Sequence, residues 1–377
     1  MRRVNGHGAS DPDLTLITGG AGFVGANLAH RLLKEKKPVL IFDNLSRPGV
    51  RRNLDWLREL HGDKLTVMVE DIRDPLAVRR AVAKARRVFH FAAQVAVTTS
   101  LLEPMEDFAV NAQGTLHVLE AARMQPHPPS VLMTSTNKVY GGLEDVALEL
   151  LGQRYAPVSP SILAHGISEQ RPLDFHSPYG CSKGTADQYV HDYARSFGLR
   201  TVVFRMSCIY GQRQFGTEDQ GWVAHFILRA LRNQPITLFG DGMQVRDILY
   251  IDDLVDAFVL ADKHIDRLAG QAFNMGGGVD NVISLLDLLD RIEALDGARP
   301  HVSFEGWRTG DQRYYVSDTR RFQQATGWRA RTSADHGIGR LYAWLREMRD
   351  LDEARQAAAI RRGRASPLVG DPACSQV

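Results

Sequence analysis

Tyr179 and Lys183 form a YxxxK pair in a segment with helical apolar spacing. Four residues along a helix bring two side chains to the same face, so the phenol and the ammonium should lie close together. A nearby cation favours the phenolate and lowers the pKa of a tyrosine, which can then remove a hydroxyl proton while a hydride leaves the same carbon. The pair predicts acid/base chemistry on an alcohol, although two unrelated surface residues would show the same spacing.

Thr136 is the third residue with a predicted chemical role. It lies in the segment MTSTNKVYG at 133–141, which follows an apolar run that predicts a buried strand. The end of that strand should deliver the threonine hydroxyl to the carboxyl edge of a parallel sheet, where ligands bind in such folds. There the hydroxyl can form a hydrogen bond with the reacting oxygen of a substrate.

Three glycines, Gly19, Gly22 and Gly25, follow the first predicted strand and open a helix. In this position one glycine makes a tight turn, one lets the backbone approach a pyrophosphate, and one lets the helix pack on the strand. The helix N-terminus adds unpaired amides that suit an anion. The pattern predicts a dinucleotide site, and a helix-start turn without a ligand is the alternative.

Asp43 stands at the end of the second predicted strand, in IFDNLS. A carboxylate there can accept hydrogen bonds from both adenosine ribose hydroxyls and repels a 2′-phosphate, so the sequence favours NAD as the cofactor. Arg47 leaves NADP as the alternative. Asp71 and Ile72 follow the third predicted strand, where they can hold an adenine ring or simply form a loop.

Short apolar runs alternate with amphipathic segments through the first two hundred residues. The runs begin near residues 14, 38, 65, 87, 130 and 200 and predict buried parallel strands. The amphipathic segments at 22–36, 104–123 and 179–197 predict helices. This alternation predicts an α/β fold, a Rossmann-like doubly wound parallel sheet that binds ligands at the carboxyl ends of its strands.

After residue 205 the rhythm changes to loops, short helices and isolated strands, with Gly-rich pieces such as FGDGMQVRD. We expect a dinucleotide-binding domain over 12–205, which includes the YxxxK helix, and a smaller C-terminal lobe over 206–348 that mainly binds substrate. Residues 349–377 lack sustained apolar periodicity and are rich in Arg, Pro and small residues, so we expect a loose tail there.

The bulk properties are typical of soluble globular proteins. Hydrophobic residues make up 44% of the 377 residues, the formal net charge is only +2, and basic residues are interleaved with acidic ones, so we expect no nucleic acid partner. Cys181, Cys208 and Cys374 form no CxxC pair, which predicts neither a disulfide framework nor a metal site. Without a leader-like or membrane-length apolar run, we expect a cytoplasmic protein that does not associate with a membrane.

Together these motifs resemble the extended short-chain dehydrogenase/reductase family of nucleotide-sugar epimerases and dehydratases, over roughly residues 14–345. The resemblance implies an NAD-dependent enzyme acting on a nucleotide-sugar. The 4,6-dehydratases of that family carry an Asp-Glu pair after the threonine, where this chain has Asn137 and Lys138, so dehydration lacks its usual acid/base groups. The cysteine that 3,5-epimerases place near this point is also missing. The remaining Thr, Tyr and Lys support oxidation to a ketone and reduction back.

A narrower resemblance is carried by HFAAQVAVTTS from His90, STNKVYG from Ser135, DFHSPYGCSKG from Asp174, YGQRQFGTEDQGW from Tyr210 and RTGDQR from Arg308. These motifs resemble a branch of the family that inverts C2 of CDP-hexoses such as CDP-paratose and CDP-tyvelose. The branch implies hydride removal from C2, rotation of a transient 2-keto sugar, and return of the hydride to its other face. We therefore expect a nucleotide-sugar 2-epimerase, with a CDP-hexose as the favoured substrate.

One position departs from the broader family, which has a substrate-contacting asparagine in an RxxNVYG pattern. Here small residues, Ser207 and Cys208, replace the amide, which favours C2 over C4 chemistry, although Cys208 can equally be a small buried hydrophobe. The resemblance assigns pyrophosphate and nucleotide contacts to Arg246, Arg308 and Arg313, whose guanidinium groups suit phosphate oxygens.

The expected site residues combine these motifs with the segments around them. The catalytic residues are Thr136, Tyr179 and Lys183. NAD is expected to contact Gly19, Gly22, Phe23, Val24, Gly25, Asp43, Asn44, Ser46, Arg47, Asp71, Ile72, Ala92, Ala93, Gln94, Tyr179 and Lys183. The substrate is expected to contact Gln94, Thr98, Thr136, Asn137, Lys138, Ser207, Cys208, Gln220, Arg246, Arg308 and Arg313.

Other functions stay open at this point. A 4-epimerase or a keto-reductase of the same fold would use the same three catalytic residues. A non-catalytic protein that binds NAD and senses a nucleotide-sugar is a second alternative, because a fold does not fix a function. His176, close to Tyr179, is expected to position a loop or face solvent rather than to act as a general acid. We also expect a homodimer or homotetramer, since such folds often form them.

Overall fold

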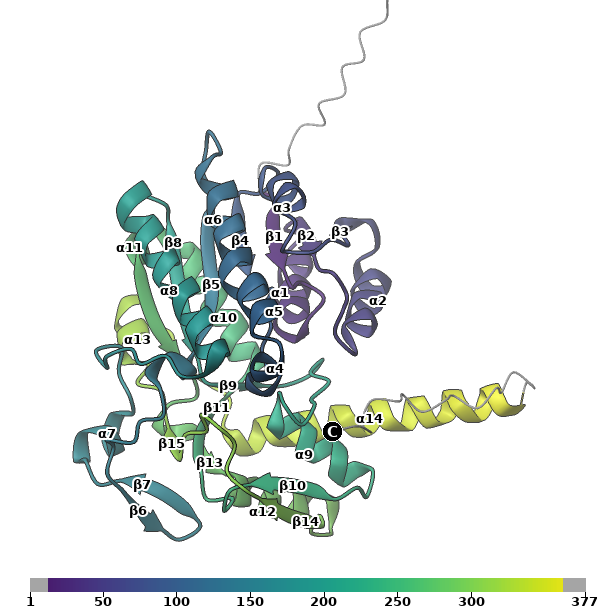
Figure 1. The fold of residues 1–377 in the computed structure, drawn as a ribbon. Coiled ribbons are helices and arrows are strands. Elements are labelled where there is room, and N and C mark those ends of the chain that lie inside the picture. The colour runs from purple at the N-terminus through teal and green to yellow at the C-terminus, as the bar shows by residue number, and fades with distance from the viewer. Residues whose placement is uncertain (1–12, 362–377) are drawn as a thin grey trace, which may run out of the picture.

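A seven-stranded parallel sheet forms the centre of the larger lobe in the computed structural model, which describes residues 13–361 (Figure 1). The strand order is β12-β8-β5-β4-β1-β2-β3. The strands are β1 Thr15–Thr18, β2 Val39–Phe42, β3 Leu65–Met68, β4 Arg87–His90, β5 Ser130–Thr136, β8 Thr201–Met206 and β12 Gln271–Met275. The predicted doubly wound sheet and its six predicted strands are confirmed.

The order of the strands reverses between β1 and β4. From β1 the chain adds β2 and β3 on one side, then crosses back to place β4, β5 and β8 on the other. The crossover connections leave in opposite directions at this point, so a crevice opens at the carboxyl ends of β1 and β4.

Both faces of the sheet are buried. Along the strands, alternate side chains such as Leu16 and Ile17 belong to two different cores. One core includes side chains of α1 Phe23–Lys34, α2 Val50–His61 and α10 Ile251–Lys263. The other includes side chains of α3 Pro75–Val82, α6 Gly114–Arg123 and α8 Ser177–Phe197.

The helical segment predicted over 104–123 is interrupted. After α4 Val97–Leu102, α5 Pro104–Phe108 runs into a π-helical turn over Ala109–Gln113, and α6 follows. The wider turn changes which side chains face the neighbouring helix, and such turns are frequent at functional sites.

The smaller lobe consists of short sheets and helices on the carboxyl side of the large sheet (Figure 1). In one sheet, β11 pairs with β13, β15 and β9, while β10 pairs with β14 and β6 with β7. The strands are β6 Leu148–Leu151, β7 Arg154–Pro157, β9 Cys208–Tyr210, β10 Ile236–Phe239, β11 Val245–Tyr250, β13 Val282–Ser284, β14 Val302–Glu305 and β15 Tyr314–Tyr315. The other helices of the described residues are α7 Pro160–His165, α9 Trp222–Leu231, α11 Ile265–Leu268, α12 Leu285–Asp296, α13 Arg320–Thr326 and α14 Ala334–Arg361.

Two features differ from the expected domain limits. β12 and α10 lie within 206–348 but pack in the larger lobe, because β12 completes the edge of the sheet beside β8. The loose tail expected from residue 349 is helical as far as Arg361 in α14. Leu, Arg, Glu and Ala are strong helix formers, and Arg52 of α2 pairs with Asp352 at 2.9 Å. Residues 362–377 of that segment lie outside the described residues.

Candidate active site

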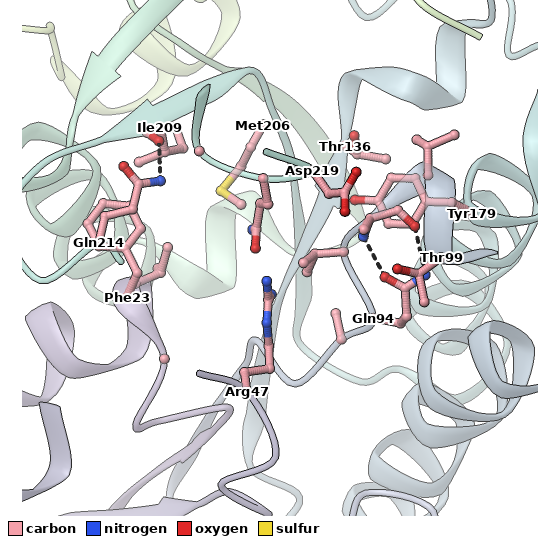
Figure 2. A pocket seen from close by; sticks show the side chains of 18 of the residues that line it. Phe23, Arg47, Gln94, Thr99, Thr136, Tyr179, Met206, Ile209, Gln214 and Asp219 are labelled. Atoms are coloured by element: carbon pink, nitrogen blue, oxygen red, sulfur yellow. Dashed lines mark hydrogen bonds between the residues drawn. The ribbon is translucent and has the colours of Figure 1, made fainter. Parts of the chain in front are cut away.

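The carboxyl ends of the central strands open into a cavity of about 810 Å³ that both lobes line. Every residue expected to contact NAD lies on its wall, and so does every residue expected to contact the substrate except Arg313. Figure 2 shows Phe23 and Arg47 on the side of the glycine loop, with Gln94, Thr136 and Tyr179 grouped on the opposite side.

The glycine loop has no space for side chains. Gly19 has a φ of +67°, and a Cβ there would lie 2.7 Å from the backbone nitrogen of Ala92. A Cβ on Gly25 would collide with the Gly19 carbonyl, so any larger residue would push α1 away from β1. The loop thus keeps the N-terminus of α1 open toward the cavity, as binding of a pyrophosphate requires.

Asp43 directly follows β2 and holds this loop in place through hydrogen bonds. Its Oδ2 accepts a hydrogen bond from Ala21 N at 3.0 Å, and its Oδ1 accepts one from Leu45 N at 2.8 Å. Burial raises the pKa of Asp43, and these backbone hydrogen bonds oppose the increase. Arg47 projects into the cavity (Figure 2), where desolvation lowers the pKa of its guanidinium and Tyr179 and Asp43 oppose that decrease.

Asp71 and Ile72 form the far end of this side of the cavity. Asp71 Oδ2 accepts a hydrogen bond from Asn44 Nδ2 at 3.0 Å, and the Arg73 guanidinium holds the pKa of Asp71 well below its usual range. Ile72 is buried and presents an apolar surface beside this carboxylate. A glycine cradle without space for a Cβ, a carboxylate at the end of β2 and this apolar wall together fit a dinucleotide.

Thr136, Tyr179 and Lys183 meet at the opposite end of the cavity. Thr136 ends β5 near Tyr179 of α8 (Figure 2), and its hydroxyl accepts a hydrogen bond from Lys138 N at 3.2 Å. Lys183 Nζ donates to the Thr134 carbonyl at 2.7 Å. Burial raises the pKa of Tyr179 to about 12 and lowers the pKa of Lys183 to about 8. This differs from the expected depression of the tyrosine pKa, because burial outweighs the opposing effects of Thr136 and of the Arg47 cation, while Lys183 is bound to a carbonyl.

Asn137 and Lys138 bind a loop of the smaller lobe. Asn137 Nδ2 donates to Gln312 Oε1 at 3.0 Å, and Lys138 Nζ donates to the Gly310 carbonyl at 2.9 Å. Lys138 Nζ also lies 3.7 Å from Asp311 Oδ1, and burial lowers the pKa of Lys138 to about 8. We call these contacts the 137–312 latch. The latch joins the end of β5 to the loop that carries Arg308.

Arg246 and Arg308 approach the cavity from the smaller lobe. Arg246 is 7% exposed, and its Nη2 donates to Asp311 Oδ1 at 2.7 Å. Arg308 Nη2 donates to Glu218 Oε1 at 2.8 Å, and its guanidinium lies 3.6 Å from the ring centroid of Phe239. Both arginines are therefore held at the wall as cations, as the sequence predicts for contacts to phosphates.

Arg313 lies outside the cavity, contrary to expectation. Its guanidinium lies 5.6 Å from the ring centroid of Tyr155 and 5.3 Å from that of Trp307. The Arg313 carbonyl accepts a hydrogen bond from Val245 N at 2.9 Å, which holds this segment extended beside β11. Neighbouring side chains of an extended chain point to opposite sides, so Arg313 faces away from the side that Gln312 occupies.

Ser207 and Cys208 line the cavity, but their side chains already form hydrogen bonds within the protein. Ser207 Oγ donates to Asp247 Oδ1 at 2.5 Å, and Cys208 Sγ accepts a hydrogen bond from Trp222 Nε1 at 3.3 Å. Burial raises the pKa of the Cys208 thiol. The open alternative of Cys208 as a small buried hydrophobe is therefore compatible with its place in the wall.

Gln94, Thr98 and Gln220 complete the predicted substrate contacts. Gln94 Nε2 donates to Asp107 Oδ1 at 3.1 Å. Gln220 forms an isolated antiparallel β-bridge with Thr217 across a tight turn. The Thr98 hydroxyl is buried and has no hydrogen-bond partner in the part of the chain that the structure describes. It is therefore ready to receive one from a ligand.

His176 precedes α8 outside the cavity wall. Its Nε2 lies 2.9 Å from Asp174 Oδ2, so the ring pairs with a neighbouring carboxylate.

Within residues 13–361 no group of three His, Cys, Asp or Glu side chains is placed to hold a metal ion. Nor is any helix in that range long and apolar enough to cross a membrane.

A family model described as the NAD dependent epimerase/dehydratase family matches residues 15–276. The chain belongs to this family. The expectation of an NAD-dependent enzyme is thereby confirmed, and NAD is the cofactor that the glycine loop and Asp43 fit.

Relatives within the epimerase/dehydratase family cover nearly the whole described chain. CDP-paratose 2-epimerase of Salmonella typhi is 43% identical over 336 residues, which are 87% of this chain and 98% of that protein. UDP-glucose 4-epimerase of Thermus thermophilus, solved in complex with NAD, has a TM-score of 0.74 at 30% identity and covers 88% of this chain and 99% of its own. UDP-glucuronic acid 4-epimerase of Bacillus cereus, solved with UDP-glucuronic acid and NAD, has a TM-score of 0.75 at 26% identity and covers 89% and 99%.

Two groups of this epimerase/dehydratase site were missed by sequence reasoning. Gln312 belongs to the RTGDQR motif, in which the sequence predicts contacts only for Arg308 and Arg313. Asp107 lies near the catalytic helix in a buried segment, and it forms a stripe with Asn111 and Thr115 at i, i+4 and i+8. A polar stripe on the buried side of a helix is the signal that could have found it.

Proposed function

We propose that this member of the epimerase/dehydratase family is a nucleotide-sugar 2-epimerase that acts on a CDP-hexose. The observation that carries the proposal is the arrangement after Thr136. Asn137 and Lys138, which stand where dehydratases have acid/base groups, are used in the 137–312 latch and leave only Thr136, Tyr179 and Lys183 for chemistry. The 43% identity to a CDP-paratose 2-epimerase supports C2 as the reacting carbon and cytidine as the base.

Thr136 and Tyr179 are placed to act on one oxygen of the sugar. Both side chains line the same end of the cavity, so a sugar oxygen placed between them could form a hydrogen bond with each. Tyr179 acts as a base in its phenolate form, after its own proton has passed to solvent. The phenolate takes the hydroxyl proton as the C2 carbonyl forms and returns it when C2 is reduced, so its charge is restored in each cycle. When bound, NAD⁺ supplies a hydride acceptor and then, reduced, a donor to the same carbon.

The two arginines of the smaller lobe are proposed to bind the substrate diphosphate. Arg246 and Arg308 are held at the cavity wall by carboxylates, and phosphate oxygens would compete for the same guanidinium groups. Holding the diphosphate at a distance from the catalytic centre leaves the sugar itself free to rotate. Such rotation is what presents the other face of the 2-keto carbon for reduction.

We also propose a homodimer and a cytoplasmic location. α4 and α5 lie beside α8 (Figure 1), and their exposed apolar side chains include Leu102 at 80%, Met105 at 77% and Phe108 at 50% exposure. Large exposed apolar side chains on neighbouring short helices are the kind of feature that a self-association site would use. Cys181 and Cys208 are free thiols, as suits a reducing compartment.

The decisive experiment incubates the purified protein with CDP-, GDP-, UDP- and dTDP-hexoses in deuterated water and follows the sugar by proton NMR. The proposal expects inversion at C2 of a CDP-hexose with no solvent deuterium at C2, because the hydride returns internally. Inversion at C4 would favour a 4-epimerase, and deuterium at the inverted carbon would indicate proton abstraction beside a ketone. No turnover of any sugar by protein that holds NAD would favour the sensor alternative.

A further inference from the structure

Asp107 is a carboxylate with no exposed surface, directly behind the catalytic helix. Among the described residues no Lys or Arg forms an ion pair with it. Removing a carboxylate from water is costly unless hydrogen bonds replace the water. The residue types around Asp107 therefore have to compensate for its burial, and the groups that do so belong to the reaction centre.

Three donors from three parts of the chain bind this carboxylate. Gln94 Nε2, in the loop after β4, donates to Oδ1 at 3.1 Å, and Asn111 Nδ2, in the π-helical turn, donates to the same oxygen at 3.0 Å. Ser182 Oγ, on α8, donates to Oδ2. A carboxylate accepts several hydrogen bonds at once, so it can join three segments that a neutral amide could not join equally well.

Two of these donors hold the catalytic groups. Ser182 immediately precedes Lys183 in the chain, and its Oγ also lies 3.3 Å from the Tyr179 carbonyl. Gln94 lies beside Thr99 and near Tyr179 in the cavity (Figure 2). Asp107 thus connects the first two turns of α8, which carry the proton-transfer pair, to the loop that lines the sugar end of the cavity.

The negative charge of Asp107 acts on the same pair. Burial lowers the pKa of Lys183, while Asp187 and Asp107 oppose that decrease. Lys183 in turn opposes the burial that raises the pKa of Asp107. His90 also interacts with Lys183. Burial lowers the pKa of His90 to about 3, so its ring is neutral. Asp107 is therefore one of two carboxylates that keep the ammonium charged.

We propose that Asp107 is a positioning residue of the catalytic centre, which fixes Gln94 and Ser182 and so aligns the Tyr179–Lys183 pair with the sugar. The proposal rests on the proposed function, because the alignment matters for a reaction at the sugar. It adds to that function a residue that touches neither the substrate nor the cofactor and acts through its three hydrogen-bonded partners.

The test compares Asp107→Asn with Asp253→Asn. Asp253 is 4% exposed and accepts a hydrogen bond from Thr332 N at 2.9 Å, so the control removes a buried carboxylate far from the reaction. We expect kcat of Asp107→Asn to fall about ten- to hundred-fold, from the usual cost of losing a charged hydrogen-bond partner, with the KM for the nucleotide-sugar and the NAD content nearly unchanged. Asp253→Asn should change only stability.

A second measurement does not depend on the substrate. The pKa of Lys183 is followed by ¹³C NMR of lysine-labelled protein, with the signal assigned from its absence in Lys183→Met. Loss of the Asp107 charge should lower this pKa, and Asp253→Asn should leave it in place. If wild-type protein turns over no nucleotide-sugar, the proposed function fails, while this titration still decides whether Asp107 acts on Lys183.

Ser182→Ala serves if Asp107→Asn does not fold. It removes one donor to Asp107 and leaves Lys183 in the chain, so kcat should fall about three- to ten-fold, as expected for one neutral donor. The proposal is overturned if Asp107→Asn loses stability like Asp253→Asn but keeps wild-type kcat and an unchanged Lys183 pKa. Wild-type kcat in Ser182→Ala overturns it as well.

Discussion

Burial sets the proton affinities of the catalytic pair in opposite directions. It raises the pKa of Tyr179 to about 12 and lowers the pKa of Lys183 to about 8, because both charged forms are disfavoured out of water. At neutral pH Lys183 is still mainly protonated and Tyr179 is a neutral phenol. Proton removal by Tyr179 therefore needs its phenolate, the charged form that a nearby cation favours.

Replacing Tyr179 with Phe tests the proton transfer at this scale. Tyr179→Phe should lower kcat at least about a hundred-fold, because general acid/base catalysis typically contributes that much or more, while the protein keeps its NAD. Turnover is measured by NMR and NAD content by chromatography of the denatured protein. Tyr193→Phe on the same helix is the control, since its hydroxyl bonds Glu120 away from the reaction. Wild-type turnover by Tyr179→Phe would remove the tyrosine from the mechanism.

At the scale of elements, the end of β5 is tied to the smaller lobe by the 137–312 latch. Asn137 and Gln312 are far apart in the sequence, yet both are buried in contact. Because Asp311 binds both Lys138 and Arg246, the latch also links the catalytic strand to a proposed diphosphate contact. Substrate affinity should therefore depend on residues that are adjacent to the catalytic threonine.

Converting the latch residues to the dehydratase pair tests this link. In Asn137→Asp/Lys138→Glu, the new Glu repels Asp311 and the new Asp cannot donate to Gln312, so the KM for the nucleotide-sugar should rise about ten-fold through the loss of two modest interactions. Steady-state kinetics and NAD content are measured beside Lys263→Glu, which reverses an exposed charge. An unchanged KM, or the appearance of a dehydrated product, would contradict this account of the latch.

His90 ties β4 to two other elements of the larger lobe. Its Nδ1 lies 2.7 Å from Thr18 Oγ1 of β1, and its Nε2 lies 3.0 Å from Thr115 Oγ1 of α6. Burial lowers its pKa from 6.5 to about 3. Below about pH 6.5 the unfolded chain binds a proton that the folded chain does not, so the free energy of unfolding falls as pH falls toward 3.

His90→Gln should reduce this acid sensitivity. Between pH 7 and pH 5 the free energy of unfolding should decrease by about 2 kcal/mol less in His90→Gln than in the wild type, at about 1.4 kcal/mol per pH unit below 6.5. Urea titrations at the two pH values measure the difference. The exposed residue His127 provides the control, since His127→Gln should match the wild type. Equal losses in all three proteins would contradict a neutral buried His90.

At the scale of the whole molecule, two lobes share one cavity and the outer face of the larger lobe carries an apolar surface. The cavity receives side chains from both lobes, so neither lobe alone would bind the proposed substrate. The exposed apolar groups of α4 and α5 lie beside α8, which carries Tyr179 and Lys183. Self-association there would therefore restrict the motion of α8, the helix that carries Tyr179 and Lys183.

Charged residues in this apolar surface should separate the proposed dimer. Leu102→Glu/Met105→Glu should elute as a monomer in size-exclusion chromatography with light scattering, because two unpaired carboxylates would be buried at the interface. Leu60→Glu, at a 53% exposed position on α2, should keep the wild-type mass. A monomeric wild type, or a double variant that keeps the wild-type mass, would place any interface elsewhere.

The sequence predicted most of the larger lobe and its ligands, for a physical reason. Buried parallel strands appear as short apolar runs, and the glycines and Asp43 follow them at spacings that a dinucleotide turn requires. The strands of the smaller lobe were harder to predict from the sequence. Its strands are two to six residues long, and β12 returns to the large sheet from a segment that looks like the other lobe.

The sequence by itself determined the fold class and the cofactor, because these depend on local periodicity and on groups at strand ends, and it predicted the three catalytic residue types. Only the tertiary structure decided which side chains face the cavity. It left Arg313 outside the cavity, buried Gln312 against Asn137, bound Lys183 to a carbonyl, and buried Asp107 among three donors. Such outcomes depend on contacts between residues far apart in the chain, and on burial, which a linear pattern does not specify.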